Sequence, residues 1–417
     1  RGNDLFEKYN YDDAIKLYLK AVEKDEKSTD LYANLADSYY HNSDMENAVI
    51  WYKSLMSEDL ESIKGEYYFR YSQALKAIGD YSNSDQWMQK LAALNADDSR
   101  ANALKFDSNY LEKIEAQSGR YEIGTVSVNT EYSDFGSGFG DRGVVFSSSR
   151  DKGGIIKATH RWTGESFLQL YSATISGEGD LIEAQKLNGD FNDKYNESSV
   201  AINNDGTTMY FTRNSYNKSY QEDLKGIIRL KLYKATKKGD RWTDIVELPF
   251  NSTEYSVSHP ALSADNTLLY FASDMPGTTG LSDLYKVEIH EDGTYGNPIN
   301  LGTEINTEGR ETFPFVSKNG DLYFSSDGHL GLGGLDVFVC NDAKSPSRKD
   351  NIFNIGKPIN SLRDDFAFVI DDDTKLGYFT SNREDGKGND DIYKLKELKP
   401  LETCETLVAG VVINKKT

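Results

Sequence analysis

The sequence lacks the residues and motifs that mark several common classes of protein. Its 417 residues include only two cysteines, Cys340 and Cys404, and no CxxC pair, so neither a zinc site nor a disulfide framework is indicated. No apolar run reaches the roughly 18 residues that a membrane-spanning helix needs. The five histidines show no paired ligand spacing, and no Gly-x-Ser-x-Gly motif occurs. We therefore expect no metal, no cofactor and no catalytic residue.

The chain also has fewer positively than negatively charged residues. The chain has 47 Lys and Arg against 67 Asp and Glu, for a net charge of −20. Phosphate backbones and anionic lipid repel such a surface, and no basic stripe interleaved with aromatic residues is present, so nucleic-acid binding is not expected. The acidic turns at 371–373 and 389–391 could bind calcium, but they lack EF-hand spacing and are also typical of ordinary turn tips.

Proline is absent before Pro249, and residues 1–118 alternate apolar and polar residues at helical spacing. Three stretches, 11–18, 45–52 and 81–88, align on the small residues Ala14, Ala48 and Ser84, which lie 34 and 36 positions apart. A small side chain at this point allows the two helices of a hairpin to pack closely. Residues 97–118, which begin with polar N-cap residues, predict a capping helix.

These repeats resemble the tetratricopeptide repeat, although the proline that usually ends each unit is missing. The resemblance implies an α-solenoid with a concave groove that binds a partner. The groove positions of the family fall on Asn3, Phe6, Asp37, Tyr40, Phe69, Gln73 and Lys76. The alternatives are that these side chains form solvated helix faces or pack against the rest of the chain.

From Tyr121 the periodicity changes to that of strands, and one pattern recurs five times. A strand that ends in aromatic residues is followed by a polar turn and a second aromatic strand, and the copies of the second strand lie 52 to 62 residues apart. The pattern begins at Val145-Phe146, Tyr210-Phe211, Tyr270-Phe271, Tyr323-Phe324 and Tyr378-Phe379. This period with four short strands is typical of a propeller blade. The predicted fold is multidomain, α plus all-β, with helical repeats at 1–118 and a five-bladed β-propeller at 119–399.

Polar residues that recur in the blades are expected on one rim of the propeller channel. The turn after each aromatic strand and the Asn-led loop before each inner strand emerge on the same face. The candidate rim residues are Arg150, Glu197, Arg213, Glu311, Asp365 and Arg383. They could hold a polar ligand or peptide over the channel. Because the motifs recur in nearly every blade, a structural role that ties neighbouring blades together is favoured.

The segment His259-Pro-Ala-Leu-Ser-Ala-Asp-Asn resembles the WD40-like, TolB-type propeller repeat. The loops at 325–336 and 381–391 are similar to those of OmpA-family envelope proteins of the Bacteroidetes, in which helical repeats, a propeller, a carboxypeptidase-regulatory-like domain and an OmpA-like domain follow one another. Residues 400–417 resemble a linker and the first strand of that regulatory-like domain, cut short.

The resemblance implies a non-enzymatic periplasmic scaffold of the outer-membrane type nine secretion or gliding machinery. Its partners would be outer-membrane or periplasmic proteins of that machinery. A lipid anchor is expected in the full-length protein, and peptidoglycan would be reached only through domains outside this sequence.

Two alternatives stay open. One is a propeller glycosidase or lyase, for which Glu197, Glu311 and Asp365 are the acids to test, because glycan cleavage needs two carboxylates roughly 5–10 Å apart. The other is a TolB-like receptor whose channel captures a peptide.

Overall fold

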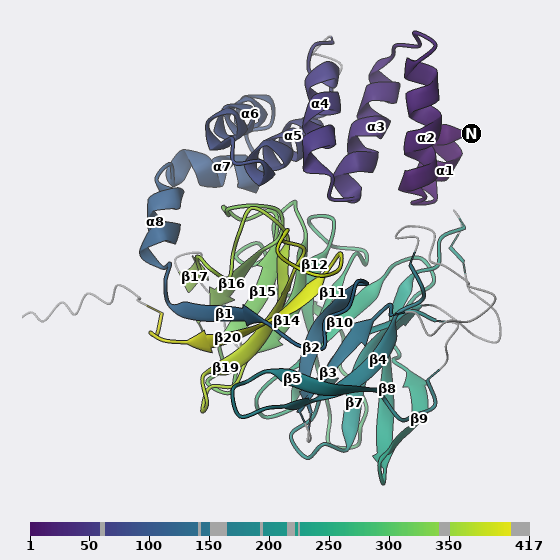
Figure 1. The fold of residues 1–417 in the computed structure, drawn as a ribbon, viewed down its shortest axis with the longest axis vertical. Helices are drawn as coiled ribbons and strands as arrows, with labels where there is room; N and C mark the ends of the chain where they lie inside the picture. Colours follow the sequence, from purple (N-terminus) through teal and green to yellow (C-terminus); the bar gives the residue numbers. More distant parts are fainter. Residues whose placement is uncertain are drawn as a thin grey trace, which may run out of the picture.

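The computed structural model describes residues 1–58, 63–140, 143–150, 165–191, 195–214, 222–223, 226–341 and 351–401. Within these ranges the chain forms an N-terminal helical region and a β-propeller, with the helices lying across one face of the propeller (Figure 1). None of the described helices combines the length and the apolar character that crossing a bilayer would require.

The helical region contains eight short helices among the described residues. They are α1 (Gly2–Glu7), α2 (Tyr11–Val22), α3 (Thr29–His41), α4 (Met45–Leu55), α5 (Gly65–Ala77), α6 (Tyr81–Leu94), α7 (Ser99–Phe106) and α8 (Tyr110–Ala116). The single capping helix expected at 97–118 is therefore two helices. Asp107, Ser108 and Asn109 separate them, and these residues compete for backbone hydrogen bonds and so favour helix ends.

Polar caps and small residues set the helix boundaries and the packing. The side chains of Ser28, Asp44 and Asp80 accept hydrogen bonds from backbone N–H groups in the first turns of α3, α4 and α6. Ala14, Ala48 and Ser84 are fully buried, as the spacing of the repeats predicted. The helices thus pack as a consecutive array, and a tetratricopeptide solenoid stays a prediction.

The propeller has five four-stranded antiparallel sheets, which confirms the number of blades expected from the repeats. Blade 1 consists of β2 (Asp134–Gly140), β3 (Gly143–Ser148), β4 (Gln169–Ile175) and β5 (Leu181–Lys186). Blade 2 consists of β6 (Glu197–Ile202), β7 (Thr208–Asn214), β8 (Leu230–Lys238) and β9 (Arg241–Glu247). Blade 3 consists of β10 (Val257–Leu262), β11 (Leu268–Ser273), β12 (Asp283–Glu288) and β13 (Ile299–Asn300). Blade 4 consists of β14 (Glu311–Val316), β15 (Leu322–Ser326), β16 (Asp336–Cys340) and β17 (Ile352–Asn354).

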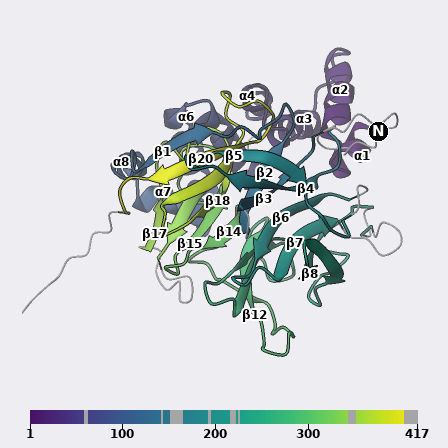
Figure 2. The ribbon, with the colours of Figure 1, turned by 60° about the horizontal axis from the view of Figure 1, so that its bottom comes forward.

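Blade 5 is assembled from both ends of the propeller segment. It consists of β18 (Asp365–Ile370), β19 (Leu376–Ser381), β20 (Asp391–Glu397) and, as its outermost strand, β1 (Tyr121–Thr125). β1 pairs with β20 so that Tyr121 lies opposite Glu397 and Thr125 opposite Tyr393. The ring in Figure 2 is therefore closed by a strand that precedes blade 1 in the sequence.

Repeated asparagines hold neighbouring blades together. In each case the side-chain amide both donates to and accepts from the backbone of one residue in the third strand of the preceding blade. The pairs are Asn129 with Ile392, Asn251 with Leu232, Asn306 with Leu284, and Asn360 with Val337. The corresponding Asn192 lies outside the described residues. The recurring Asn is thus a fixed link between blades.

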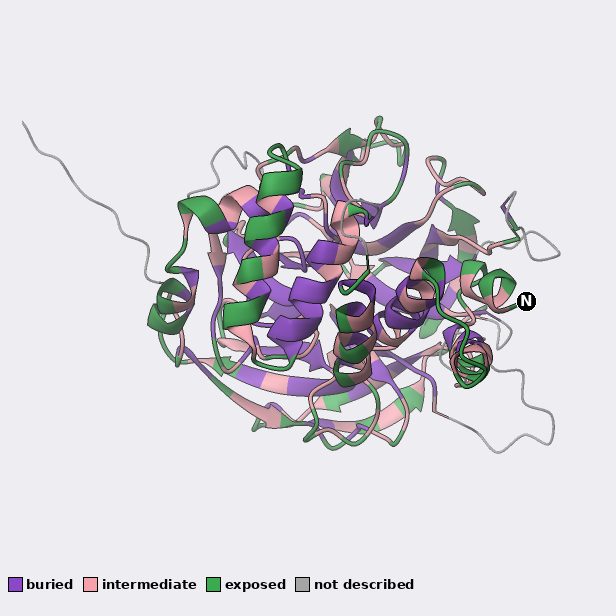
Figure 3. Ribbon diagram, turned by 90° about the horizontal axis from the view of Figure 1, so that it is seen from above, coloured by how far each residue is buried: buried purple, intermediate pink, exposed green. Residues whose placement is uncertain are grey.

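The helical region is attached to blades 4 and 5. The main link is the 327–335 loop of blade 4, whose Leu332 is buried in the same apolar cluster as α3 to α8. The Leu332 carbonyl accepts a hydrogen bond from the Tyr81 hydroxyl at 2.8 Å, and Ser99 on α7 donates to Glu308. Figure 3 shows buried helix faces alternating with exposed ones where the array lies over the propeller.

The segment that was expected to begin a regulatory-like domain is almost wholly outside the described residues, which end at Leu401.

Candidate functional site

The propeller has two chemically different ends. We call the end where the five inner strands begin the strand-start face, and the end with the turns between the first and second strands of each blade the hairpin face. The helical region lies on the strand-start face, because its contacts with Glu308, Asp327 and Leu332 fall in loops at that end. The predicted rim residues belong to the strand-start face as well.

The rim residues form ion pairs within single blades. Arg150 binds Asp134 at 2.7 Å, Arg213 binds Glu197 at 2.5 Å, and Arg383 binds Asp365 at 2.6 Å. The exposed fractions of the Asp134, Glu197 and Asp365 side chains are 0%, 1% and 0%. Each carboxylate is held by its own blade, so the structure does not gather these acids around an open ligand site.

Glu311 occupies the same position in blade 4 without an arginine partner. Its carboxyl group accepts hydrogen bonds from the backbone and hydroxyl of Thr307 and from the hydroxyl of Ser326. Complete burial raises the pKa of Glu311 to about 8. Burial also raises the pKa of Asp365 to about 6, although Arg383 lowers it. Each of these two carboxyl groups, at the first residue of an inner strand, binds the loop that precedes its strand.

The predicted groove on the helices faces the propeller at its C-terminal end. Gln73 donates a hydrogen bond to the Asp327 carbonyl at 2.7 Å. Phe69 lies beneath the guanidinium of Arg100 at 3.9 Å, and Arg100 itself contacts the Glu308 carbonyl. Lys76 is buried, which lowers its pKa even though Asp336 and two further carboxylates oppose the shift. These positions form an interface within the chain.

The remaining groove positions lie further along the array. Asp37 is buried and binds Arg70 and the Tyr52 hydroxyl, both at 2.6 Å. Tyr40 is buried in the helical core. Asn3 is exposed and accepts a hydrogen bond from Tyr18, and Phe6 is half-buried against Tyr11. The seven positions therefore do not form one continuous open groove.

In the two acidic turns Asp371 and Asp391 accept hydrogen bonds from nearby backbone groups, but Asp391 Oδ1 has no hydrogen-bond partner among the described residues. Asp371 accepts hydrogen bonds from the backbone of Asp373 and from the backbone and hydroxyl of Thr374. Within the described ranges no group of three or more His, Cys, Asp or Glu side chains could hold a metal ion.

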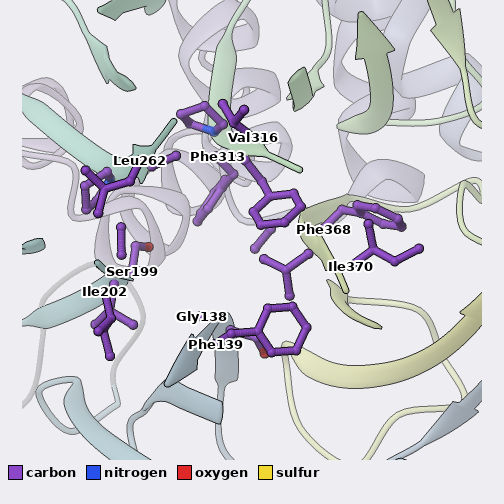
Figure 4. A pocket seen from close by; sticks show the side chains of 18 of the residues that line it. Gly138, Phe139, Ser199, Ile202, Leu262, Phe313, Val316, Phe368 and Ile370 are labelled. Atoms are coloured by element: carbon purple, nitrogen blue, oxygen red, sulfur yellow. The ribbon is translucent and has the colours of Figure 1, made fainter. Parts of the chain in front are cut away.

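A cavity of about 400 Å³ occupies the centre of the propeller and opens toward the hairpin face. All five inner strands, β2, β6, β10, β14 and β18, contribute to its wall. The wall is mainly apolar, and Figure 4 shows Phe139, Ile202, Leu262, Val316 and Phe368 around it. A concave, mainly apolar cavity with a few polar groups is the usual form of a binding site.

The deep end of the cavity is shaped by a β-bulge in every inner strand. Each bulge places one residue in the left-handed backbone region. These residues are Gly136 (φ 73°), Ser199 (φ 47°), His259 (φ 54°), Phe313 (φ 47°) and Ala367 (φ 52°). Non-glycine residues rarely adopt this conformation, and it directs their side chains differently from those of a regular strand. The bulges thus form a ring of equivalent positions that the five blades fill with different side chains.

Aromatic rings gather at and beside this deep end, and of those described next His259 and Phe313 line the cavity itself. His259 stacks on Phe313 with ring centroids 3.7 Å apart, Phe313 lies 4.8 Å from Phe366, and Phe366 lies 6.1 Å from Phe135. Blades 3, 4, 5 and 1 thus each supply a ring, whereas blade 2 has serine at positions 198 and 199. The deep end is therefore asymmetric.

The mouth of the cavity is polar. It is lined by Asn204, Asn266, Lys318, Asp371 and Asp372 from four hairpins. Lys318 pairs with Asp373, so adjacent hairpins are linked at the rim. A ligand would pass these charged and amide groups before it reached the apolar wall.

The site residues predicted from the sequence lie on the strand-start face or the helices, and none of them lines the cavity, although the channel itself was named in the peptide-receptor alternative. Alternation in segments such as Val257–Leu262 indicates an inner strand, but it does not reveal the bulge that turns His259 toward the axis. The available signal was the loss of strict alternation at the same point of each repeat, in Ser-His-Pro, Thr-Phe-Pro and Phe-Ala-Phe.

No family model matches this sequence. Among solved structures, the chain is similar to a thermostable family-43 glycoside hydrolase at 14% identity and a TM-score of 0.41, with 68% of this chain and 98% of the other covered. It is also similar to the GH43_1 enzyme from Xanthomonas citri (10% identity, TM-score 0.42, 72% and 96% covered). A third similar structure is the Trypanosoma rangeli sialidase (11% identity, TM-score 0.36, 66% and 59% covered).

These findings correct two expectations from the sequence. These three solved structures are two glycoside hydrolases and a sialidase, which contradicts the expectation of a non-enzymatic secretion scaffold, and neither the scaffold function nor the absence of enzymatic activity is retained. At these identities and TM-scores the likeness gives this chain no substrate and no catalytic residue.

Proposed function

We propose that the propeller channel is a receptor site for an extended peptide segment with apolar side chains, which enters from the hairpin face. The observation that carries this proposal is the cavity of about 400 Å³, walled by apolar side chains from all five blades. Burial of apolar side chains in such a cavity supplies about 25 cal/mol per Å² of surface removed from water.

The inner strands favour a peptide over other apolar ligands. β2, β6, β10, β14 and β18 each come at the end of the strand order in their sheet, so one backbone edge of each has no neighbouring strand in that sheet. An extended peptide can bond to such an edge through its main chain while its side chains fill apolar pockets.

The distribution of carboxylates argues against a glycan in the channel. Among the described residues that line the cavity, the acids are Asp371 and Asp372, and both lie at its mouth. Glycoside cleavage needs two carboxylates beside the scissile bond, and a sugar needs many polar partners. The apolar wall provides neither at depth.

A titration with a synthetic peptide tests the proposal. The probe is acetyl-Lys-Leu-Val-Leu-Val-amide, whose lysine suits the acidic mouth and whose remaining residues suit the wall. We expect saturable binding in isothermal titration calorimetry with a negative heat-capacity change, the marker of apolar burial. Ile202→Trp places a larger side chain on the cavity wall and should weaken binding at least about tenfold, or about 1.4 kcal/mol.

A matched control is available on the outside of the propeller. Val246 on β9 is 58% exposed, so Val246→Trp adds the same indole away from the channel and should leave binding unchanged. Equal binding to the wild type and to Ile202→Trp would show that the peptide does not enter the channel.

Glycan hydrolysis is the second candidate, and the raised pKa of Glu311 favours it. A general acid must be protonated at the working pH, and a carboxyl group with a pKa of about 8 meets that condition. Its burial beneath Thr307 and Ser326 leaves it no open approach in this structure. Turnover of a panel of p-nitrophenyl glycosides that is lost in Glu311→Gln would favour hydrolysis over peptide capture.

The periplasmic location and the envelope protein partners implied by the family resemblance stay predictions. Fractionation of the native cell envelope would test the location.

A further inference from the structure

The five bulge positions at the deep end of the channel are equivalent in backbone but not in chemistry. Gly136, Phe313 and Ala367 present no polar side-chain group, whereas Ser199 and His259 on adjacent blades present a hydroxyl and an imidazole. The propeller repeat is thus broken at blades 2 and 3. Purely structural groups in this molecule, such as the linking asparagines, recur from blade to blade, so the break points to a specific role.

A second break in the repeat fixes the orientation of His259. In three blades the backbone N–H of the bulge residue donates to a hydroxyl on the preceding blade: Gly136 to Thr380, Ser199 to Ser147, and His259 to Thr212. At the next interface the corresponding residue is Ala272, which has no hydroxyl. There, the Thr312 hydroxyl lies 2.5 Å from His259 Nδ1 instead.

The His259 ring is therefore held on two sides. Thr312 binds Nδ1, and the Phe313 ring stacks on one face with an interplanar angle of 13°. His259 also lines the cavity, and its Nε2 has no hydrogen-bond partner among the described residues. The second ring nitrogen is left available in an otherwise apolar part of the wall.

Two further polar atoms lie in the same wall. The hydroxyl oxygens of Ser137 and Ser199 are buried and have no hydrogen-bond partner among the described residues, and both side chains are 6% exposed. Figure 4 shows the Ser199 oxygen directed toward the space between the labelled side chains. Buried polar atoms without partners are rare in folded proteins, so these two hydroxyl groups set this part of the wall apart from the framework.

We propose that His259 is the specificity-determining contact of the channel, where its Nε2 hydrogen-bonds a backbone amide group of the bound peptide. This inference rests on the proposed function. Burial lowers the pKa of His259 to about 3, so the ring is neutral at physiological pH. A neutral ring in an apolar wall suits an uncharged amide better than a carboxylate or phosphate, whose desolvation it would not offset.

The repeat itself provides the substitution that tests this role. Phe313 occupies the equivalent left-handed position in blade 4, so His259→Phe keeps an aromatic ring in a backbone conformation that this fold accepts for phenylalanine. Ala367 occupies the position in blade 5, which makes His259→Ala a second variant should the first fail to fold. Thermal melting of both variants reports whether the propeller is intact.

The experiment combines the variant with a change in the ligand. Binding of acetyl-Lys-Leu-Val-Leu-Val-amide is compared with that of analogues in which one amide at a time is replaced by an ester, which removes the N–H and weakens the carbonyl acceptor. We expect His259→Phe to reduce the binding affinity for the parent peptide about fivefold to tenfold. One ester analogue should bind equally to the wild type and the variant, because neither complex then has the hydrogen bond. A purely structural role of His259 would affect all ligands alike.

The outcomes separate this inference from the proposed function. If the parent peptide binds, Ile202→Trp blocks it and His259→Phe binds as the wild type does, the role of His259 is refuted and the channel receptor stands. If His259→Phe reduces the binding affinity of every ester analogue by the same factor as that of the parent peptide, the proposed hydrogen bond is refuted. If the wild type binds no peptide, the proposed function falls, and this inference falls with it.

Discussion

The two ends of the propeller differ in what their polar residues do. At the strand-start face, arginines, carboxylates and asparagines are numerous, buried and bonded to one another, and the helical region covers part of them. Along the channel wall, between the deep end and the polar mouth, polar side chains are few, and the hydroxyl groups of Ser137 and Ser199 have no partner among the described residues. Abundant polar side chains therefore mark the framework of this propeller, and scarce ones mark its candidate site.

The largest effect is expected where the helical region joins the strand-start face. Leu332 is 3% exposed and packs among the helices, so Leu332→Ala should destabilise this junction by about 2–5 kcal/mol, the usual range for a buried leucine. Hydrogen exchange of α5 and α6 should become faster, while the strands of blade 2 stay protected.

The chain offers a control for this change. Leu281 lies in the corresponding loop of blade 3 and is 46% exposed, so Leu281→Ala should have little effect. Unchanged exchange in α5 and α6 of Leu332→Ala would mean that the junction contributes little to the stability of the helices.

A comparably large effect concerns the links between blades. Asn360 is 1% exposed and bonds both backbone groups of Val337, so Asn360→Ala leaves a buried N–H and a buried carbonyl without partners. At about 1–3 kcal/mol for each of the two groups, the free energy of unfolding should fall by roughly 2–6 kcal/mol, seen as a lower melting temperature. Asn251 makes the same bonds but is half-buried, so Asn251→Ala should lower the free energy of unfolding by less than Asn360→Ala does. Equal losses for the two variants would show that burial is not the reason.

A smaller effect should appear in the dependence of stability on pH. The pKa of Glu311 is about 8 in the folded state, against an ordinary value of 4.5. Between these values the folded chain keeps a proton that the unfolded chain loses, so this group's contribution to stability falls as pH rises from about 4.5 through 8. Glu311→Gln does not ionise, and the hydroxyls of Thr307 and Ser326 can turn to accept from its amide.

Melting temperatures measured between pH 5 and pH 8.5 test this point. The variant should lose less stability than the wild type as pH rises. Parallel curves for the two proteins would mean that Glu311 does not hold its proton in the folded state.

The smallest effect is expected on the outer surface of blade 2. Arg241 and Asp190 form an ion pair at 2.6 Å with both side chains about half exposed. Such pairs contribute about 0.2–1 kcal/mol or less, so Arg241→Ala should barely move the melting temperature, and less still in high salt. A shift as large as that of Asn360→Ala would contradict the distinction between framework and surface.

The repeats made much of the fold predictable. A pair of aromatic strands, the second of which recurs every 52 to 62 residues, predicted five blades, and the linking role of the asparagines followed from their recurrence. The sequence did not reveal that β1 completes blade 5, because Tyr121–Thr125 pairs with strand residues more than 260 positions away. Nor did it show that Gln73 and Lys76 meet the propeller, since that depends on how two separately folded surfaces fit.

The candidate site was less predictable for a related reason. Charged residues such as Glu197 and Arg213 stand out in a sequence, and the structure does bring them together, but within one blade and away from solvent. The cavity depends on backbone bulges at His259 and its equivalents, which local sequence preference hardly encodes.

The way in which β1 closes the ring has a mechanical consequence. The chain enters the propeller at Tyr121 and leaves it opposite, at Glu397, on paired antiparallel strands. Once the contacts of the helical region with blades 4 and 5 are broken, force applied across Tyr121 and Glu397 would load the first backbone pair of β1 and β20 alone, and then the next pair. Under tension β1 would therefore separate from β20 one residue pair at a time, while the other blades, which bear load only through their neighbours, stayed intact.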